Sequence, residues 1–107
     1  MAKDYKFNRT WGIPVRYHDL QKMHKMSNLD LVEIHLSYKD MELDFSDYLK
    51  EPMDLDLVVH APELFAGDLT LDLCAQDETY RKRSINEMQR VIDLTRELTS
   101  YFTKAKR

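Results

Sequence analysis

Two histidines and a glutamate stand where a parallel α/β protein places its reactive groups. His60 lies in the strand end Val58-Val59-His60-Ala61-Pro62, and Glu33 and His35 lie in a second apolar run at residues 29–36. In parallel α/β proteins, sites form where the carboxyl ends of the strands meet. A neutral imidazole and a carboxylate can hold a divalent metal or share a proton in acid–base chemistry. We therefore take Glu33 and His60 as candidate catalytic residues, and His60 as a candidate metal ligand.

A structural explanation competes with this chemical one. A histidine that closes a strand often serves only as a hydrogen-bonding group, and a catalytic metal site needs about three protein ligands. Strand alternation puts Glu33 and His35 on one face of their strand, and His60 on the same face as Val58. The chemical hypothesis therefore requires these two faces to coincide in the folded sheet.

Other polar groups favour structural roles. His18 and His24 are six residues apart, so they cannot form the i,i+4 metal pair of a helix. The acidic residues between 40 and 47 lack the central glycine and the glutamate spacing of a calcium loop, which favours a solvated face. Cys74 lies among aliphatic residues and is expected to be a packed thiol. As the only cysteine, it excludes an internal disulfide and a thiolate metal cage.

The elements that must position these residues alternate between strand-like and helix-like patterns. Strands are expected at residues 11–17, 29–36 and 55–60, and helices at residues 19–26, 45–50 and 77–102. The first strand should lie at an edge because Pro14 cannot donate to a ladder. Asp77 is expected to cap the last helix. The apolar stripe expected along this helix consists of Ile85, Met88, Val91 or Ile92, Thr95, Leu98 and Phe102. The connection at residues 63–76 is too apolar for a free linker and is expected to pack over the strand ends.

Strands separated by helices predict an α/β fold with parallel pairing and crossover connections. The chain has 107 residues, whereas a closed β/α barrel typically needs roughly 250. We therefore expect a partial β/α barrel with about three parallel strands, crossover helices and a long C-terminal helix. This domain should span residues 11–107, after a flexible N-terminal segment at residues 1–10.

Composition excludes several classes of function. The net charge of −3 argues against nonspecific binding to nucleic acid. Two glycines are too few for a glycine-rich phosphate loop. No apolar run approaches the roughly 18 residues of a membrane span, and no signal-peptide core is visible. The sequence thus predicts a cytoplasmic protein without a membrane partner.

The segment at residues 58–65 resembles the xylose-isomerase-like barrel superfamily, in which the third strand commonly ends in a His-Ala-Pro-type motif. That superfamily includes sugar-phosphate isomerases and epimerases and the metal-dependent apurinic endonucleases. The segment at residues 31–34 is similar to the second-strand Val-Glu segment of the isomerases, and Arg83-Ser84-Ile85 is similar to the following helix start. The resemblance covers roughly residues 29–100. It implies that His60 binds metal or substrate, with Glu33 as the second residue carried over.

The resemblance further implies a module of a sugar phosphate isomerase/epimerase-like barrel in carbohydrate metabolism. The later strands of the superfamily, which supply further metal ligands and bases, have no counterpart here, so the chain alone should not be catalytically complete. In a complete barrel, the implied ligands are a sugar phosphate and a divalent metal such as Zn²⁺, Mn²⁺ or Mg²⁺. The opening segment at residues 7–15 also resembles a junction in extended sialic-acid-synthase-like proteins, which make surface sugars.

Two alternatives stay open. Several copies could assemble a complete metal site with isomerase or apurinic endonuclease-like activity. The chain could instead be a non-enzymatic interaction or oligomerisation module, because open sheet edges invite pairing with another chain. In each case the expected partner is a second copy or the remainder of a larger parent protein.

Overall fold

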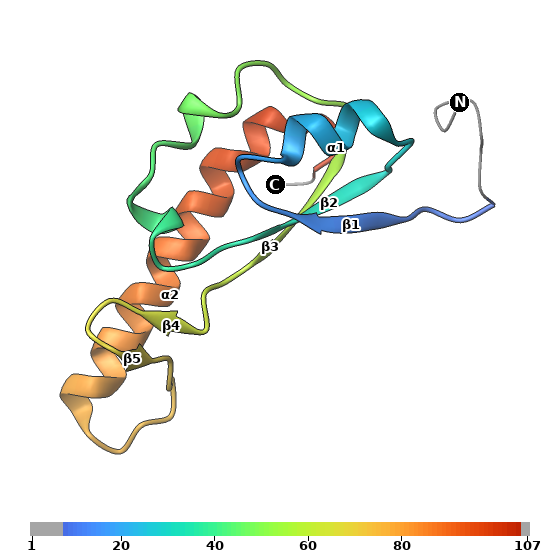
Figure 1. Cartoon of the computed structure of the whole chain (residues 1–107). Coiled ribbons are helices and arrows are strands. Elements are labelled where there is room, and N and C mark those ends of the chain that lie inside the picture. Colours follow the sequence, from blue (N-terminus) through green and yellow to red (C-terminus); the bar gives the residue numbers. More distant parts are fainter. Residues whose placement is uncertain (1–7, 106–107) are drawn as a thin grey trace.

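Three parallel strands form the central sheet of the computed structural model, which describes residues 8–105 (Figure 1). The strands are β1 (Gly12–Val15), β2 (Leu31–His35) and β3 (Asp56–His60), in the order β1-β2-β3. The sheet therefore follows chain order, and all carboxyl ends meet at one edge. This confirms the expected parallel α/β sheet. Of the flexible segment expected at residues 1–10, residues 1–7 lie outside the described part, as do residues 106 and 107.

Strand β1 occupies an edge, as Pro14 predicts. Its register pairs Gly12 with Leu31 and Val15 with Ile34. At Gly12 the two backbones approach so closely that a Cβ atom would meet the carbonyl oxygen of Leu31 and its side chain. Glycine is therefore required by space at this position, not by backbone conformation.

The two crossovers differ in structure. Helix α1 (Leu20–Met26) connects β1 to β2, whereas only two 3₁₀ turns, η2 (Asp40–Glu42) and η3 (Phe45–Asp47), lie between β2 and β3. The expectation of an α-helix at residues 45–50 is therefore wrong, because this segment forms only the 3₁₀ turn η3. The side chain of Asp44 accepts a hydrogen bond from Ser46 N, and the following Pro52 cannot continue a helix, so only a single short turn forms.

Helices cover only one face of the sheet. Figure 1 shows α1 and α2 (Glu78–Leu98) together on the same side. Residues that point toward this side are buried, as Val15, Val32 and Ile34 show with exposed fractions of 3%, 0% and 1%. They belong to the main apolar cluster, which also contains residues of both helices. Within residues 8–105, no helix lies over the opposite face of the sheet.

A small hairpin occupies the connection between β3 and α2. Strands β4 (Leu64–Phe65) and β5 (Leu69–Thr70) pair antiparallel, and the turn between them contains two residues with positive φ, Gly67 and Asp68. The hairpin packs beside α2, where Tyr80 Oη donates to the Thr70 carbonyl at 2.6 Å. As expected, this connection is not a free linker, because Phe65 and Leu69 are buried in the main apolar cluster.

Helix α2 begins where the sequence predicts. The side chain of Asp77 accepts a hydrogen bond from Tyr80 N at 2.8 Å. Its buried stripe, however, passes through Ser84, Val91 and Leu98, and leaves Ile85 and Ile92 exposed at 47% and 40%. The helix and the hairpin extend away from the sheet, so the molecule measures 53 × 30 × 23 Å.

After α2, the chain returns to the outer side of β3. A 3₁₀ turn, η4 (Thr99–Tyr101), leads to Phe102, which forms a parallel bridge with Met53 just before β3. The apolar side chain of Phe102 is almost fully buried. Among residues 8–105, no helix is both long and apolar enough to cross a membrane.

Candidate functional site

The uncovered face of the sheet carries all three residues that the sequence singles out for chemistry. The register pairs Glu33 with Val58 and His35 with His60. Paired residues of parallel strands point to the same side, and alternation places all four side chains on one face. The face of β2 that carries Glu33 and His35 and the face of β3 that carries His60 therefore form one face of the sheet, which the sequence alone could not establish. This is the face without helices.

His35 and His60 lie side by side at the carboxyl ends of β2 and β3. Their ring centroids are 4.2 Å apart and the rings are tilted by 54°. His35 is exposed and His60 is half-buried. The Nδ1 atom of His60 is buried and has no hydrogen-bond partner in the described residues. A histidine with a purely structural role would normally satisfy that nitrogen, so this pair is the strongest candidate for ligand binding.

Glu33 lies on the same face but two residues before the end of β2, beside Val58 on the neighbouring strand. It is half-buried. Within residues 8–105, no group of three or more histidine, cysteine, aspartate or glutamate side chains is arranged to hold a metal ion. Because a catalytic zinc site needs about three protein ligands, these residues supply only part of such a site.

An ion pair with a buried carboxylate, which the sequence interpretation missed, holds the loop at this end of the sheet. Asp40 is 8% exposed, and its Oδ2 accepts hydrogen bonds from Arg16 Nη2 at 2.6 Å and from Ser37 N at 2.7 Å. Arg16 directly follows β1, and Ser37 lies two residues after the end of β2. The carboxylate therefore ties the ends of two strands together. The signal available in the sequence was the Ser-x-x-Asp spacing immediately after a strand, which favours a side-chain-closed turn.

Tyr17 lies beside this ion pair and is only 4% exposed. Its hydroxyl has no hydrogen-bond partner in the part of the chain that is described, and its ring stacks on Tyr48 with centroids 5.9 Å apart. Burial, and secondarily the negative charge of Asp40, raises the pKa of Tyr17 to about 12. Tyr17 is therefore a neutral packing residue at ordinary pH.

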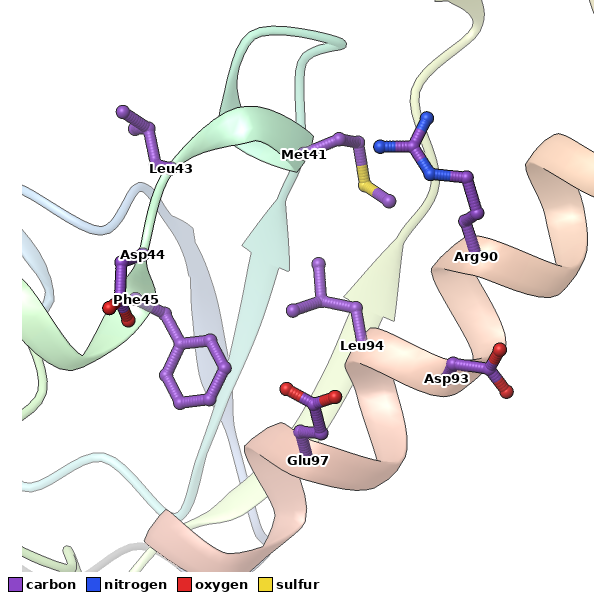
Figure 2. Close-up of a pocket in the computed structure, with 8 residues that line it drawn as sticks. All are labelled: Met41, Leu43, Asp44, Phe45, Arg90, Asp93, Leu94 and Glu97. Atoms are coloured by element: carbon purple, nitrogen blue, oxygen red, sulfur yellow. The ribbon is translucent and has the colours of Figure 1, made fainter.

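A second concave region lies between the 3₁₀ turns and α2 (Figure 2). It has a volume of about 310 Å³, and Met41, Phe45 and Leu94 point into the space between the two segments. Arg90, a positively charged residue that lines this region, already forms ion pairs with Glu42 and Glu87, at 3.1 and 2.9 Å. A phosphate would therefore find no free positive charge here, which makes the histidine pair the better candidate site.

The remaining polar candidates stay apart from this site. His18 is exposed on the turn before α1. Cys74 is exposed, so the expectation of a packed thiol is wrong. Its backbone N–H donates to the side chain of Asp72 at 3.0 Å, in a turn that directs residue 74 away from the apolar cluster. The thiol of Cys74 is thus exposed and not packed among aliphatic side chains.

Comparison with known proteins identifies no relative of this chain. No family model matches it, and neither the curated proteins nor the solved structures contain a match.

Proposed function

We propose that this chain is a partial β/α-barrel module of the isomerase/epimerase type, and that its uncovered sheet face binds a divalent cation and a sugar phosphate. The observation that carries the proposal is the adjacency of His35 and His60 at the carboxyl ends of two neighbouring parallel strands. In β/α barrels, these ends and the interior face of the sheet form the active site.

The arrangement of the elements supports the barrel interpretation. Strands follow one another in chain order, and both helices lie on one side of the sheet, as in a barrel wall. A doubly wound sheet would instead place helices on both faces. The uncovered face then corresponds to the barrel interior, and completing it requires strands from a parent protein or from other copies.

Each residue has a proposed role. His60 binds the cation or contacts the substrate through its imidazole, which lies beside that of His35. Glu33, on the same face, serves as a further ligand or as a general base. His35 holds the ring of His60 in place and offers a second nitrogen. Because a complete catalytic set is lacking, we propose that activity appears only after assembly, in a cytoplasmic setting that suits the lone cysteine.

The proposal can be tested by NMR titration of the histidine side chains. Addition of Zn²⁺, Mn²⁺ or a sugar phosphate should shift or broaden the resonances of His35 and His60, and leave those of His18 unchanged. The variant His60→Ala should lose the response, whereas the control His18→Ala should keep it. Absence of any selective response to all of these ligands would refute the binding role.

The second candidate function, a non-enzymatic interaction module, is favoured by a separate observation. The sheet ends at β3 over most of its length within residues 8–105, and open parallel edges pair readily with other chains. A chain that self-associates without any ligand, and whose association is unchanged in His60→Ala, would support this candidate over the first.

A further inference from the structure

Strand β3 has an outer edge along which no other strand of residues 8–105 pairs at Leu57 and Val59. The N–H of Asp56 donates to the β2 side at 2.9 Å, and the C=O of His60 accepts from that side at 3.0 Å. Because backbone groups alternate in direction along a strand, those of Leu57 and Val59 point to the opposite, outer edge. No other strand of the described residues pairs with β3 on that side.

This edge is already used for pairing just before β3. Thr103 N donates to the carbonyl of Met53 at 3.0 Å, and Lys104 N donates to that of Leu55 at 3.2 Å. Because backbone groups alternate in direction along a strand, those of residues 53 and 55 point to the same edge as those of residues 57 and 59. The open part of the edge therefore continues an existing line of backbone hydrogen bonds.

We propose that two copies of this chain pair antiparallel through the open edges of β3, and that each of two equivalent sites binds a divalent cation through His35, His60 and the partner's Asp56. The inference rests on the proposed function in one respect, since it takes His60 as a metal ligand. It goes further by naming the partner and the ligand that the partner supplies.

The register follows from the two-fold symmetry. If Val58 lies opposite the partner's Val58, then the outward-pointing residues Leu57 and Val59 face each other across the axis and exchange backbone hydrogen bonds. Two residues from the axis, His60 then lies opposite the partner's Asp56. Directly opposed side chains have Cβ atoms about 4.5–5.5 Å apart and share one face. That face is the uncovered one, where His35 already lies beside His60.

Three properties of the single chain fit this pairing. Val58 is 48% exposed, although it is an apolar residue in the middle of a strand, and the pairing would cover it. Asp56 is exposed and negatively charged, which complements an imidazole or a bound cation. Two histidines and a carboxylate from the partner give the three protein ligands that a zinc site with an open position uses, a number that residues 8–105 of one copy do not bring together.

One local contact must change on pairing. Within one copy, the carboxylate of Asp56 accepts a hydrogen bond from Leu57 N at 2.8 Å. In the dimer, Leu57 N donates instead to the carbonyl of the partner's Val59, and the carboxylate turns to the cation. Since both donor and acceptor gain a new partner, no buried polar group is left unpaired.

The test measures mass and zinc content together, with Cys74→Ser introduced in every variant so that the exposed thiol cannot bind metal. Addition of ZnCl₂ should double the mass of 12.8 kDa in light scattering, with one zinc bound per chain. Asp56→Asn and His60→Ala should each weaken zinc-dependent dimerisation by at least about tenfold, since losing a ligand costs no less than losing a group that orients one. The controls Asp47→Asn and His18→Ala should behave as the parent chain does.

Mixing the two defective variants gives a sharper result. A heterodimer of Asp56→Asn with His60→Ala contains one intact site, so the mixture should recover zinc-dependent dimers at up to half the parental zinc content. Zinc bound through His60 at unchanged mass, with no effect of Asp56→Asn, would overturn the dimer site and leave the proposed function standing. No zinc binding, and no response of His60 to any ligand of the earlier titration, would overturn both.

Discussion

The two faces of one short sheet differ in nearly every physical property. On the covered face, Val32 and Ile34 are buried beneath two helices, and they belong to the main apolar cluster. On the uncovered face, the same strands present Glu33, His35 and His60, with Val58 half exposed among them. The covered face supplies the stability of the fold, and the uncovered face has the polar groups. Substitutions should therefore have unequal effects on the two faces.

The largest loss of stability is expected at Gly12, where even the uncovered side of the sheet has no room for a side chain. Gly12 lies by alternation on the uncovered side, yet a Cβ atom there meets the backbone of Leu31. Gly12→Ala should force β1 away from β2 and cost about 3 kcal/mol of unfolding free energy. Urea denaturation followed by circular dichroism measures this. A stability equal to that of the parent chain would show that β1 is not held at this distance.

A matched pair of substitutions compares the faces directly. Val32→Ala removes two buried methyl groups and should cost about 2 kcal/mol, because the fully buried site cannot collapse completely. Val58→Ala makes the same chemical change at a side chain that is 48% exposed, and should cost less than about 0.5 kcal/mol in the single chain. Equal losses in urea denaturation would contradict the difference between the faces.

An intermediate effect is expected at the edge where the two faces meet. Asp40→Asn keeps the shape of the side chain but removes the charge that holds Arg16 and the backbone of Ser37. We expect a loss of about 1.5 kcal/mol, since Arg16 remains partly exposed and can be solvated. As a control, Asp47→Asn changes an exposed carboxylate and should leave the denaturation midpoint unchanged.

A modest gain in stability is expected at Tyr17. Tyr17→Phe removes a buried hydroxyl that has no partner in the described residues, and should stabilise the chain by up to about 1 kcal/mol. Because the pKa of Tyr17 is raised from 10.0 to about 12, the neutral form is favoured in the folded state. The contribution is complete below pH 10 and is lost as the pH rises through about 12. The parent chain should therefore lose more stability than Tyr17→Phe over this range, as measured by denaturation at fixed pH values.

Several parts of the fold were predictable because their causes are local. The apolar runs at residues 29–36 and 55–60 predict strands, Pro14 predicts an edge, and Asp77 predicts a helix start; each is confirmed. The stripe of α2 was only partly predictable. Ile85 and Ile92 have the spacing of a buried stripe, yet stay exposed. The side of α2 that packs on the protein runs instead through Ser84, Val91 and Leu98, and the first two of these each lie one residue before an exposed isoleucine.

The candidate site was likewise predictable from the sequence only in part. The sequence by itself determined that His60 ends a strand and that Glu33 and His35 share a face, because alternation is a property of each strand alone. Only the tertiary structure decided that His35 lies beside His60, since register depends on how two distant segments pair. It also decided that Asp40 is buried and that one face stays uncovered. These outcomes depend on which elements pack together, and no local pattern in the chain contains that information.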